Sequence, residues 1–191
     1  MNTAGLILAA GESKRMGSPK ALLDFRGETF LDRLIGVFSQ FCAPVVVVVG
    51  HDAARIRTGV KNSARVVFTE NTDYQLGQFS SMQCGLRAIP ESIDGVLFTL
   101  VDHPAVRPST VQALLDDPGL LAIPSFQGRR GHPIYLHRNL ISEFLALPAD
   151  SQAKLVVNRH LADIRYAEVD DPGILSDIDD PAAYRRLLET V

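Results

Sequence analysis

Residues 45–49 read Val-Val-Val-Val-Val, an apolar run with no alternating polar positions. A continuous run of this kind is typical of a strand in a parallel sheet, because helices cover such a strand on both faces. Just before the run, large apolar side chains recur at helical spacing: Phe30, Leu34, Phe38 and Phe41. This part of the chain therefore predicts a helix followed by a buried parallel strand.

The same alternation continues along most of the chain. Further short apolar runs predict strands at residues 6–8, 65–69, 96–100, 120–124, 134–136 and 164–169. Segments of helical period predict helices at residues 53–60, 80–89, 109–116, 139–147, 152–159 and 181–190. Alternating strands and helices indicate a three-layer α/β/α, Rossmann-like fold with a mostly parallel sheet. Folds of this class bind ligands beyond the carboxyl ends of their strands.

Length, charge and cysteine usage narrow the class of protein. The 191 residues suit one domain, and 46% hydrophobic against 21% charged residues indicates a globular chain. With 19 basic and 22 acidic residues the net charge is −3, so neither nucleic acid nor an anionic membrane is an expected partner. Cys42 and Cys84 have no CxxC spacing, which predicts reduced thiols. Because neither a signal peptide nor an apolar run of membrane-spanning length is found, a cytoplasmic location is expected.

The segment after the first expected strand has the composition of an anion-binding loop. Residues 8–20 read Leu-Ala-Ala-Gly-Glu-Ser-Lys-Arg-Met-Gly-Ser-Pro-Lys. Small residues let backbone N–H groups approach an anion, and Lys14, Arg15 and Lys20 put three cations in one loop. The glycine spacing matches neither a P-loop nor the GxGxxG dinucleotide fingerprint. A phosphate-binding loop and a surface turn with solvated lysines both suit this composition.

Aspartates follow a strand in the middle of the chain and precede its last helix. Asp102 comes directly after the apolar run at residues 96–101. Its carboxylate suits Mg²⁺, which prefers oxygen ligands, and equally a turn in which it bonds its own backbone. Asp177 and Asp179 are two residues apart, a spacing that points both side chains the same way in an extended segment. Either is a candidate second metal ligand. The alternative is that Asp179 or Asp180 caps the helix that begins at Pro181.

The loop at residues 8–20 resembles the LAAGxSxRMGxxK signature of nucleotidyltransferases related to the molybdenum cofactor cytidylyltransferases, a MobA-like family within the nucleotide-diphosphosugar transferase fold. The resemblance implies that the loop wraps a nucleotide and its triphosphate. It marks these positions as nucleotide-binding: Leu8, Ala9, Ala10, Gly11, Ser13, Arg15 and Lys20. Arg15 and Lys20 are implied to be the catalytic phosphate cations, whereas Lys14 falls at a variable position. Guanylyltransferase relatives usually have LAGG at the start of this loop and a glycine at the position of Ser13. By this resemblance Ala10 and Ser13 favour a pyrimidine nucleotide.

Three further segments extend the resemblance. Asp102-His103-Pro104 is similar to the family's Asp-x-Pro, and residues 177–181 are similar to its DIDTP motif. The similarity implies that Asp102, a catalytic residue, holds Mg²⁺ or Mn²⁺ together with Asp177 or Asp179. Residues 77–86 resemble the family's G-x-x-S-S-[LM]-x-x-G-L. This segment implies nucleotide contacts from Ser80 and Ser81, with Ser81 at the base, although serines at such a position also cap helices.

The acceptor side carries one match and one departure. Residues 128–133 resemble the family's G-x-x-GHP, which implies that Arg130, Gly131 and His132 face an anionic phosphate or pterin. A solvated hairpin turn is the alternative. At residues 149–154 the chain reads Ala-Asp-Ser-Gln-Ala-Lys, where a GDxGAR-like stretch is common. If this stretch contacts the acceptor, the loss of both glycines and the change of arginine to lysine favour an acceptor other than molybdenum-pterin.

The resemblance implies one nucleotidyltransferase domain over residues 1–191, with a nucleotide-binding part to about residue 125 and an acceptor side at about residues 126–180. The implied reaction is Mg²⁺-dependent transfer of CMP from CTP to a phosphorylated acceptor, a molybdopterin-type cofactor, with release of pyrophosphate. Two alternatives stay open. One keeps the chemistry with GTP, a sugar phosphate or a phosphorylated alcohol, and the other is a nucleotide- or cofactor-binding protein without turnover. The expected partners are these small molecules and, transiently, the enzymes that accept the finished cofactor.

Overall fold

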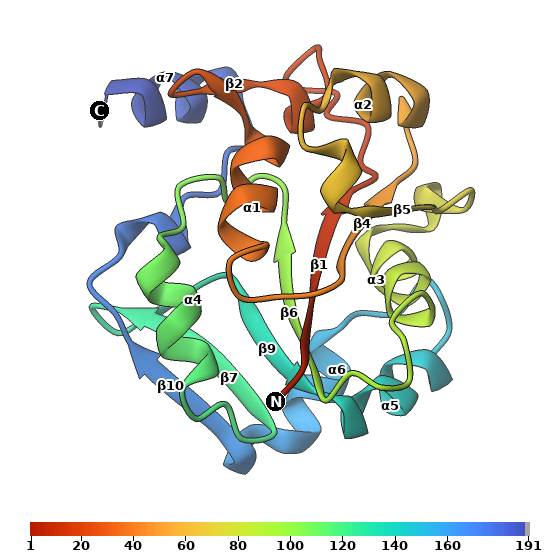
Figure 1. Ribbon diagram of the computed structural model, residues 1–191, viewed down its shortest axis with the longest axis vertical. Coiled ribbons are helices and arrows are strands. Elements are labelled where there is room, and N and C mark those ends of the chain that lie inside the picture. The colour runs from red at the N-terminus through yellow and green to blue at the C-terminus, as the bar shows by residue number, and fades with distance from the viewer. Residues whose placement is uncertain (190–191) are drawn as a thin grey trace.

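One mixed sheet of eight strands forms the centre of the computed structural model, which describes residues 1–189 (Figure 1). Across the sheet lie β10 (Ile164–Glu168), β7 (Leu121–Phe126), β9 (Ile134–His137), β6 (Gly95–Leu100), β1 (Thr3–Ala9), β4 (Val45–Val49) and β5 (Val67–Glu70), and the short β8 (Arg129–Arg130) pairs with β7. β9 runs antiparallel to both neighbours and β8 runs antiparallel to β7, whereas the other pairs of this sheet are parallel. The expected mostly parallel sheet is confirmed.

Helices cover both faces of this sheet. Side chains of α1 (Phe30–Phe38), α2 (Ala53–Gly59), α4 (Pro108–Leu115) and α7 (Pro181–Glu189) pack in one hydrophobic core, and those of α3 (Gln78–Arg87), α5 (Ile141–Ala146) and α6 (Lys154–Val157) pack in the other. β1 contributes to both cores by alternation, because Ile7 belongs to the first core and Leu6 to the second. The predicted three-layer α/β/α, Rossmann-like class is confirmed.

The valine run and the helix before it form as their sequence pattern predicts. All five residues of β4 are buried between β1 and β5. α1 begins after Thr29, whose Oγ1 accepts a hydrogen bond of 2.9 Å from the backbone N–H of Asp32. The apolar face of α1 is buried along its length, including Phe30 and Phe38. This packing holds the sheet and α1 as a rigid support for the loops at one sheet edge.

Several element boundaries differ from the predicted ones. Residues 63–65 form a 3-10 turn, so β5 begins at Val67. The helices expected at residues 139–147 and 152–159 contain only the short α5 and α6, next to the 3-10 segments Arg138–Leu140 and Asn158–Asp163. Residue 190 of the last expected helix lies outside the described residues.

A two-stranded hairpin of β2 (Asp24–Phe25) and β3 (Glu28–Thr29) was not expected. Arg26 and Gly27 connect its strands with φ angles of 60° and 82°. Positive φ at both central residues is typical of the two-residue turns that join antiparallel strands.

The composition-based expectations concern thiols and membranes. Cys42 and Cys84 are free thiols, and burial raises the pKa of Cys42 to about 12, which keeps this thiol protonated at neutral pH. Within residues 1–189 the structure contains no helix that is long and apolar enough to cross a bilayer.

Parallel pairing brings distant parts of the chain to one edge of the sheet. β1 and β6 are neighbours, with Leu8 paired to Leu100, so the residues that follow these strands leave the sheet side by side. The segment before α7 joins them there, because the N–H of Ile178 donates to the carbonyl oxygen of Asp102 at 3.1 Å. This edge is the place where ligand binding is expected for the fold class.

Candidate active site

A cleft of about 400 Å³ opens beyond the carboxyl ends of β1 and β6. Its lining comes from residues 8–15, 19–21, 77–78 and 100–102, together with Ile56, Tyr74, Ser81 and Asp179. The lining includes these predicted site residues: Leu8, Ala9, Ala10, Gly11, Ser13, Arg15, Lys20, Ser81, Asp102 and Asp179. The remaining predicted residues lie outside the lining: Ser80, Asp177, Arg130, Gly131 and His132.

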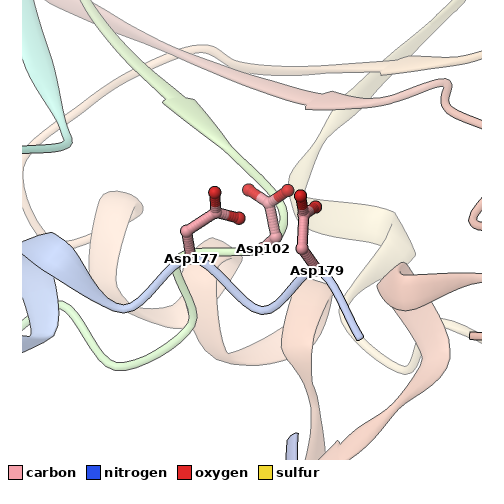
Figure 2. Close-up of side chains that lie close together, drawn as sticks. All are labelled: Asp102, Asp177 and Asp179. Carbon is pink, nitrogen blue, oxygen red and sulfur yellow. The ribbon is translucent and has the colours of Figure 1, made fainter. Parts of the chain in front are cut away.

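Three carboxylates meet at the rim of this cleft. Asp102 follows β6, and Asp177 and Asp179 lie in the extended segment before α7. Figure 2 shows the three carboxyl groups pointing to the same side of that segment, and one oxygen of each lies within 4.8 Å of the others. Both Asp102 oxygens face other side chains, Lys20 and His103, rather than the backbone of their own turn.

Two cations of the first loop bind this acidic cluster. Lys20 Nζ lies 2.9 Å from Asp102 Oδ2 and 2.6 Å from Asp179 Oδ1, and its side chain is only 12% exposed. Arg15 Nη2 lies 2.7 Å from Asp179 Oδ2, and this side chain is 67% exposed. Lys14 instead pairs with Glu12. The structure thus brings together the predicted phosphate cations and the predicted metal ligands.

The charges of the cluster determine its protonation. Although burial alone would raise the pKa of Asp102, hydrogen bonds from His103 and Lys20 and the lysine charge lower it to about 2. The hydrogen bond from Lys20 and the contact with Arg15 lower the pKa of Asp179. Burial raises the pKa of Asp177, and the neighbouring charges of Asp102 and Asp179 raise it further. Within residues 1–189 Asp177 is the member of the triad that forms no direct ion pair, and the charges of His103 and Lys20 only partly offset the rise in its pKa.

The donor set fits a hard divalent cation. Mg²⁺ and Mn²⁺ take oxygen ligands at about 2.1 Å, so three carboxylate oxygens within 4.8 Å of one another can surround one ion. Asp102, Asp177 and Asp179 would hold it, with phosphate oxygens of a ligand completing its coordination. Asp180 has a different role: its Oδ1 accepts a hydrogen bond of 2.7 Å from the N–H of Ala183 and caps α7.

The first loop is folded around Ser13. Its Oγ accepts a hydrogen bond of 3.1 Å from the N–H of Lys20, and its carbonyl oxygen accepts one of 2.9 Å from the N–H of Met16. Ser13 has a φ of 51°, in the left-handed region that favours glycine. The hydroxyl offsets this strain, because its hydrogen bond fastens the start of the loop to Lys20.

The serines of α3 belong to a buried hydrogen-bond network. α3 is preceded by Gly77 and has no side-chain cap, so the helix-cap interpretation of Ser80 and Ser81 is wrong. Asn71 Nδ2 donates to Ser80 Oγ at 2.9 Å and to Ser81 Oγ at 3.0 Å. Only Ser81 lines the cleft. Sequence reasoning missed Asn71, although it follows the carboxyl end of β5 as Asp102 follows β6.

The ring of His132 is enclosed beside the acidic cluster. Its centroid lies 4.8 Å from the ring of His103 and 5.5 Å from that of Phe98. Burial, together with the charge of His103, lowers the pKa of His132 to about 4, so the ring is neutral at physiological pH. Its Nδ1 is buried without a hydrogen-bond partner among the residues described.

The other two predicted acceptor-side residues lie at the hairpin of β7 and β8: Arg130 belongs to β8 and Gly131 follows it. The Arg130 guanidinium stacks over the ring of Tyr166 in β10, 4.3 Å from its centroid. Gly131 lies so close to the backbone of Ile174 that an added Cβ would approach its carbonyl oxygen within 2.1 Å. Residues 150–154 of the altered stretch line a second hollow of about 450 Å³, which shares Gly77 and Gln78 with the first cleft.

Comparison with known proteins identifies the family. A model described as the MobA-like NTP transferase domain matches residues 5–164. The chain belongs to this family. It is a nucleotidyltransferase, and the MobA-like family resemblance inferred from the motifs is confirmed.

Two curated relatives of this MobA-like protein carry different names. Molybdenum cofactor cytidylyltransferase of Escherichia coli (strain K12) is 26% identical over 181 residues, which cover 92% of this chain and 90% of that protein. Nicotine blue oxidoreductase of Paenarthrobacter nicotinovorans is 34% identical over 149 residues, which cover 71% of each chain. Among solved structures, Rv0371c from Mycobacterium tuberculosis H37Rv has a TM-score of 0.85 at 27% identity over 100% of both chains. A structure of Rv0371c in complex with manganese has a TM-score of 0.78 at 25% identity, again over 100% of both chains.

The MobA-like chain also contains cleft residues that sequence reasoning missed. Tyr74 and Gln78 line the cleft, and the Tyr74 ring lies 5.9 Å from that of His51. Gln78 stands at a variable position of the G-x-x-S-S segment, so the motif alone did not identify it. Tyr74 belongs to a 3-10 turn that no apolar pattern predicts.

Proposed function

We propose that this MobA-like enzyme transfers CMP from CTP to a phosphorylated acceptor, a molybdopterin-type cofactor, in a reaction that depends on Mg²⁺ or Mn²⁺. The observation that carries the proposal is the meeting of the acidic triad with Lys20 and Arg15 at the rim of one cleft. The cleft volume of about 400 Å³ falls in the range of small-molecule sites. The cytidylyltransferase relative, which matches 92% of the chain, supports the choice of CTP and acceptor.

Nucleotidyl transfer of this type needs no side-chain nucleophile. An oxygen of the acceptor phosphate attacks the α-phosphorus of CTP, the bond from that phosphorus to the bridging oxygen of the β-phosphate breaks, and pyrophosphate leaves in line. The protein has to align the two reactants and offset the charge that develops on the phosphate oxygens. A bound divalent ion supplies part of that neutralisation as a Lewis acid.

The chain's own residues supply the rest. Lys20 is charged, since Asp102 and Asp179 raise its pKa against the lowering effect of burial. Its ammonium and the exposed guanidinium of Arg15 stand beside the triad, where the triphosphate would lie. Small residues at positions 9–11 allow backbone N–H groups to approach the nucleotide. Ser81, which also lines the cleft, is the proposed base contact.

The acceptor is proposed to bind next to the second hollow. Two of the departures, Gln152 and Lys154, line that hollow, and Lys154 stands in place of the family's arginine. Arg130, Gly131 and His132 complete the proposed acceptor side. In this proposal the protein works in the cytoplasm on small molecules and makes only transient contact with cofactor-accepting enzymes.

Pyrophosphate release tests the proposal. Purified protein with Mg²⁺ or Mn²⁺ is assayed with CTP, GTP, UTP and ATP, each with molybdopterin, with a sugar phosphate, with a phosphorylated alcohol and alone. Release with CTP and molybdopterin only is the expected result. Turnover with another nucleotide and acceptor would support nucleotidyl transfer but contradict the proposed substrates. Tight nucleotide binding without any turnover would contradict the proposal that the protein is an enzyme.

An oxidoreductase is a second candidate, favoured by the 34% identical relative of that name. The chain lacks the GxGxxG fingerprint, and its acidic triad suits phosphate chemistry better than hydride transfer. Binding of NADH, NADPH and flavin nucleotides, measured by fluorescence beside CTP, discriminates the two. Submicromolar binding of one of these cofactors, with CTP unbound, would favour the oxidoreductase.

A further inference from the structure

The buried side chain of Asn71 connects the end of β5 to the start of α3. It is 6% exposed, and its backbone N–H donates to the carbonyl oxygen of Val49 at 2.8 Å. Its Nδ2 donates to the hydroxyl oxygens of Ser80 and Ser81, and its Oδ1 accepts a hydrogen bond of 3.0 Å from the N–H of Asp73. Both N–H donors of the amide group and one acceptor site of its oxygen are therefore directed to this junction.

The orientation of the amide follows from its partners. A backbone N–H can only donate, so the Asn71 atom that faces Asp73 has to be the oxygen. The NH₂ group consequently faces the two serines and donates one hydrogen bond to each hydroxyl oxygen. Both serine oxygens must accept, which leaves each hydroxyl hydrogen for another partner.

The two hydroxyl hydrogens have different destinations. The Ser80 hydroxyl donates within the protein, to the carbonyl oxygens of Gly77 at 2.8 Å and Asp73 at 3.1 Å. Within residues 1–189 the Ser81 hydroxyl donates to no protein acceptor, and Ser81 is one of the residues that line the cleft. Ser81 is only 4% exposed, and a buried hydroxyl that donates no hydrogen bond is unfavourable. A ligand with an acceptor atom at this place in the cleft would satisfy the hydroxyl.

We propose that Asn71 is a positioning residue that keeps Ser81 a hydrogen-bond donor toward the base, and that it thereby selects cytosine over uracil. The inference rests on the proposed function, in which Ser81 contacts the base. Cytosine carries an unprotonated acceptor at N3, whereas uracil carries an N–H donor there. A site built to donate discriminates against the base whose edge also donates, because one of the two groups is left unpaired.

A single change reverses the direction of these bonds. In Asn71→Asp the second carboxylate oxygen replaces the NH₂ group, so Ser81 has to donate to residue 71 and offers only lone pairs to the cleft. The variant should lower kcat/KM for CTP and reduce the CTP-to-UTP ratio of kcat/KM about tenfold. Ser81→Ala should reduce the same ratio, and adding Asn71→Asp to Ser81→Ala should not reduce it further.

Two variants control for stability. Asn71→Ala removes the amide without burying a charge, and it should shift the ratio in the same direction by a smaller factor, since the Ser81 hydroxyl is then free to rotate. Gln83→Ala removes a different buried amide, which belongs to α3. The Gln83 Nε2 donates to the carbonyl oxygens of Phe144 and Leu147, each at 2.8 Å, and Gln83 lies outside the cleft lining. Gln83→Ala should lower the unfolding temperature and leave the CTP-to-UTP ratio unchanged.

The outcomes separate this inference from the proposed function. Equal losses for CTP and UTP in both Asn71 variants, or an Asn71→Asp effect on the ratio that persists in the Ser81→Ala background, would overturn the role of Asn71. If calorimetric titration shows that the unmodified protein binds neither CTP nor UTP, the proposed function fails and this inference fails with it. CTP turnover by the unmodified protein, with an unchanged ratio in the variants, rejects the inference alone.

Discussion

Lys20 Nζ lies 2.9 Å from Oδ2 of Asp102, which ties the loop after β1 to the residue that follows β6. The same ammonium lies 2.6 Å from Oδ1 of Asp179. Lys20 therefore places one positive charge between two of the three carboxylates that would hold a divalent ion. Lys20 and a divalent ion would bind the same carboxylate oxygens of Asp102 and Asp179. We therefore expect the two to compete until a triphosphate attracts Lys20 away from the aspartates.

The first prediction concerns Lys20→Met. Without the ammonium, Oδ2 of Asp102 and Oδ1 of Asp179 lose their lysine partner, so Mn²⁺ should bind about tenfold more tightly in the absence of nucleotide. Pyrophosphate release should nevertheless fall by about 10²-fold or more, because the charge that stabilises the transferring phosphate is gone. Electron paramagnetic resonance of free Mn²⁺ measures the first effect and a pyrophosphate assay the second.

Lys14→Met is the matched control for metal binding. Lys14 belongs to the same loop, but it pairs with Glu12 and touches none of the three aspartates. The Mn²⁺ affinity of Lys14→Met should stay close to that of the unmodified protein. If both lysine variants tighten Mn²⁺ binding equally, a general charge effect explains the result and the direct competition is rejected.

The second prediction concerns Asp102→Asn, which keeps the side-chain shape and removes the charge. Pyrophosphate release should fall by about 10²-fold or more, since Lys20 and the proposed metal lose a shared ligand. Circular dichroism should show an intact fold, because the site lies at the rim of the cleft and outside the two hydrophobic cores. Activity within tenfold of the unmodified protein would reject the assignment of Asp102.

The sequence was sufficient to predict the members of the acidic cluster but not their partners. Asp102 was identifiable because it follows a buried apolar run, and the ends of parallel strands meet at one edge. That β6 lies beside β1 does not follow from chain order, since β2 to β5 come between them along the chain. The contact of Lys20 with Asp102 depends on that adjacency, so local pattern could not reveal it.

The sequence also could not predict where the hydroxyls of Ser80 and Ser81 point or that the ring of His132 is enclosed. Ser80 and Ser81 are identical neighbours in the motif, yet only the second lines the cleft, because α3 turns the first toward Gly77 and Asp73. The flanking Gly131 and Pro133 give His132 the local appearance of a turn residue. Its enclosure by Phe98 and His103 depends on β6, which precedes it by more than thirty positions in the chain.

The third prediction separates Asp177 from Asp179. Asp177→Asn and Asp179→Asn should each weaken Mn²⁺ binding, because each removes one carboxylate of the triad. Only Asp179→Asn should tighten CTP binding in the presence of EDTA, since it releases both Lys20 and Arg15 from a competing anion. Calorimetric titrations of Mn²⁺ and CTP with the two variants measure both effects. An unchanged Mn²⁺ affinity in either variant removes that residue from the metal site.

The last prediction concerns the pH dependence of stability at His132. The folded protein lowers the pKa of this ring to about 4, and an unfolded histidine has a pKa of about 6.5. Above pH 6.5 neither state binds the proton, so the stabilising contribution is fully present there. As the pH falls from about 6.5 to about 4, the unfolded chain takes up a proton that the folded chain excludes, and stability is lost by up to about 3 kcal/mol.

His132→Phe keeps a ring against Phe98 and His103 and removes the titrating group. Urea unfolding of both proteins at pH 7.5, about pH 5.5 and about pH 4.5 should show a smaller loss of unfolding free energy in the variant as the pH falls. The difference between the two proteins should change by roughly 1 kcal/mol for each pH unit in this interval. Parallel stability curves for the two proteins would show that His132 takes up its proton equally in the folded and unfolded chain, contrary to its enclosure between the two rings.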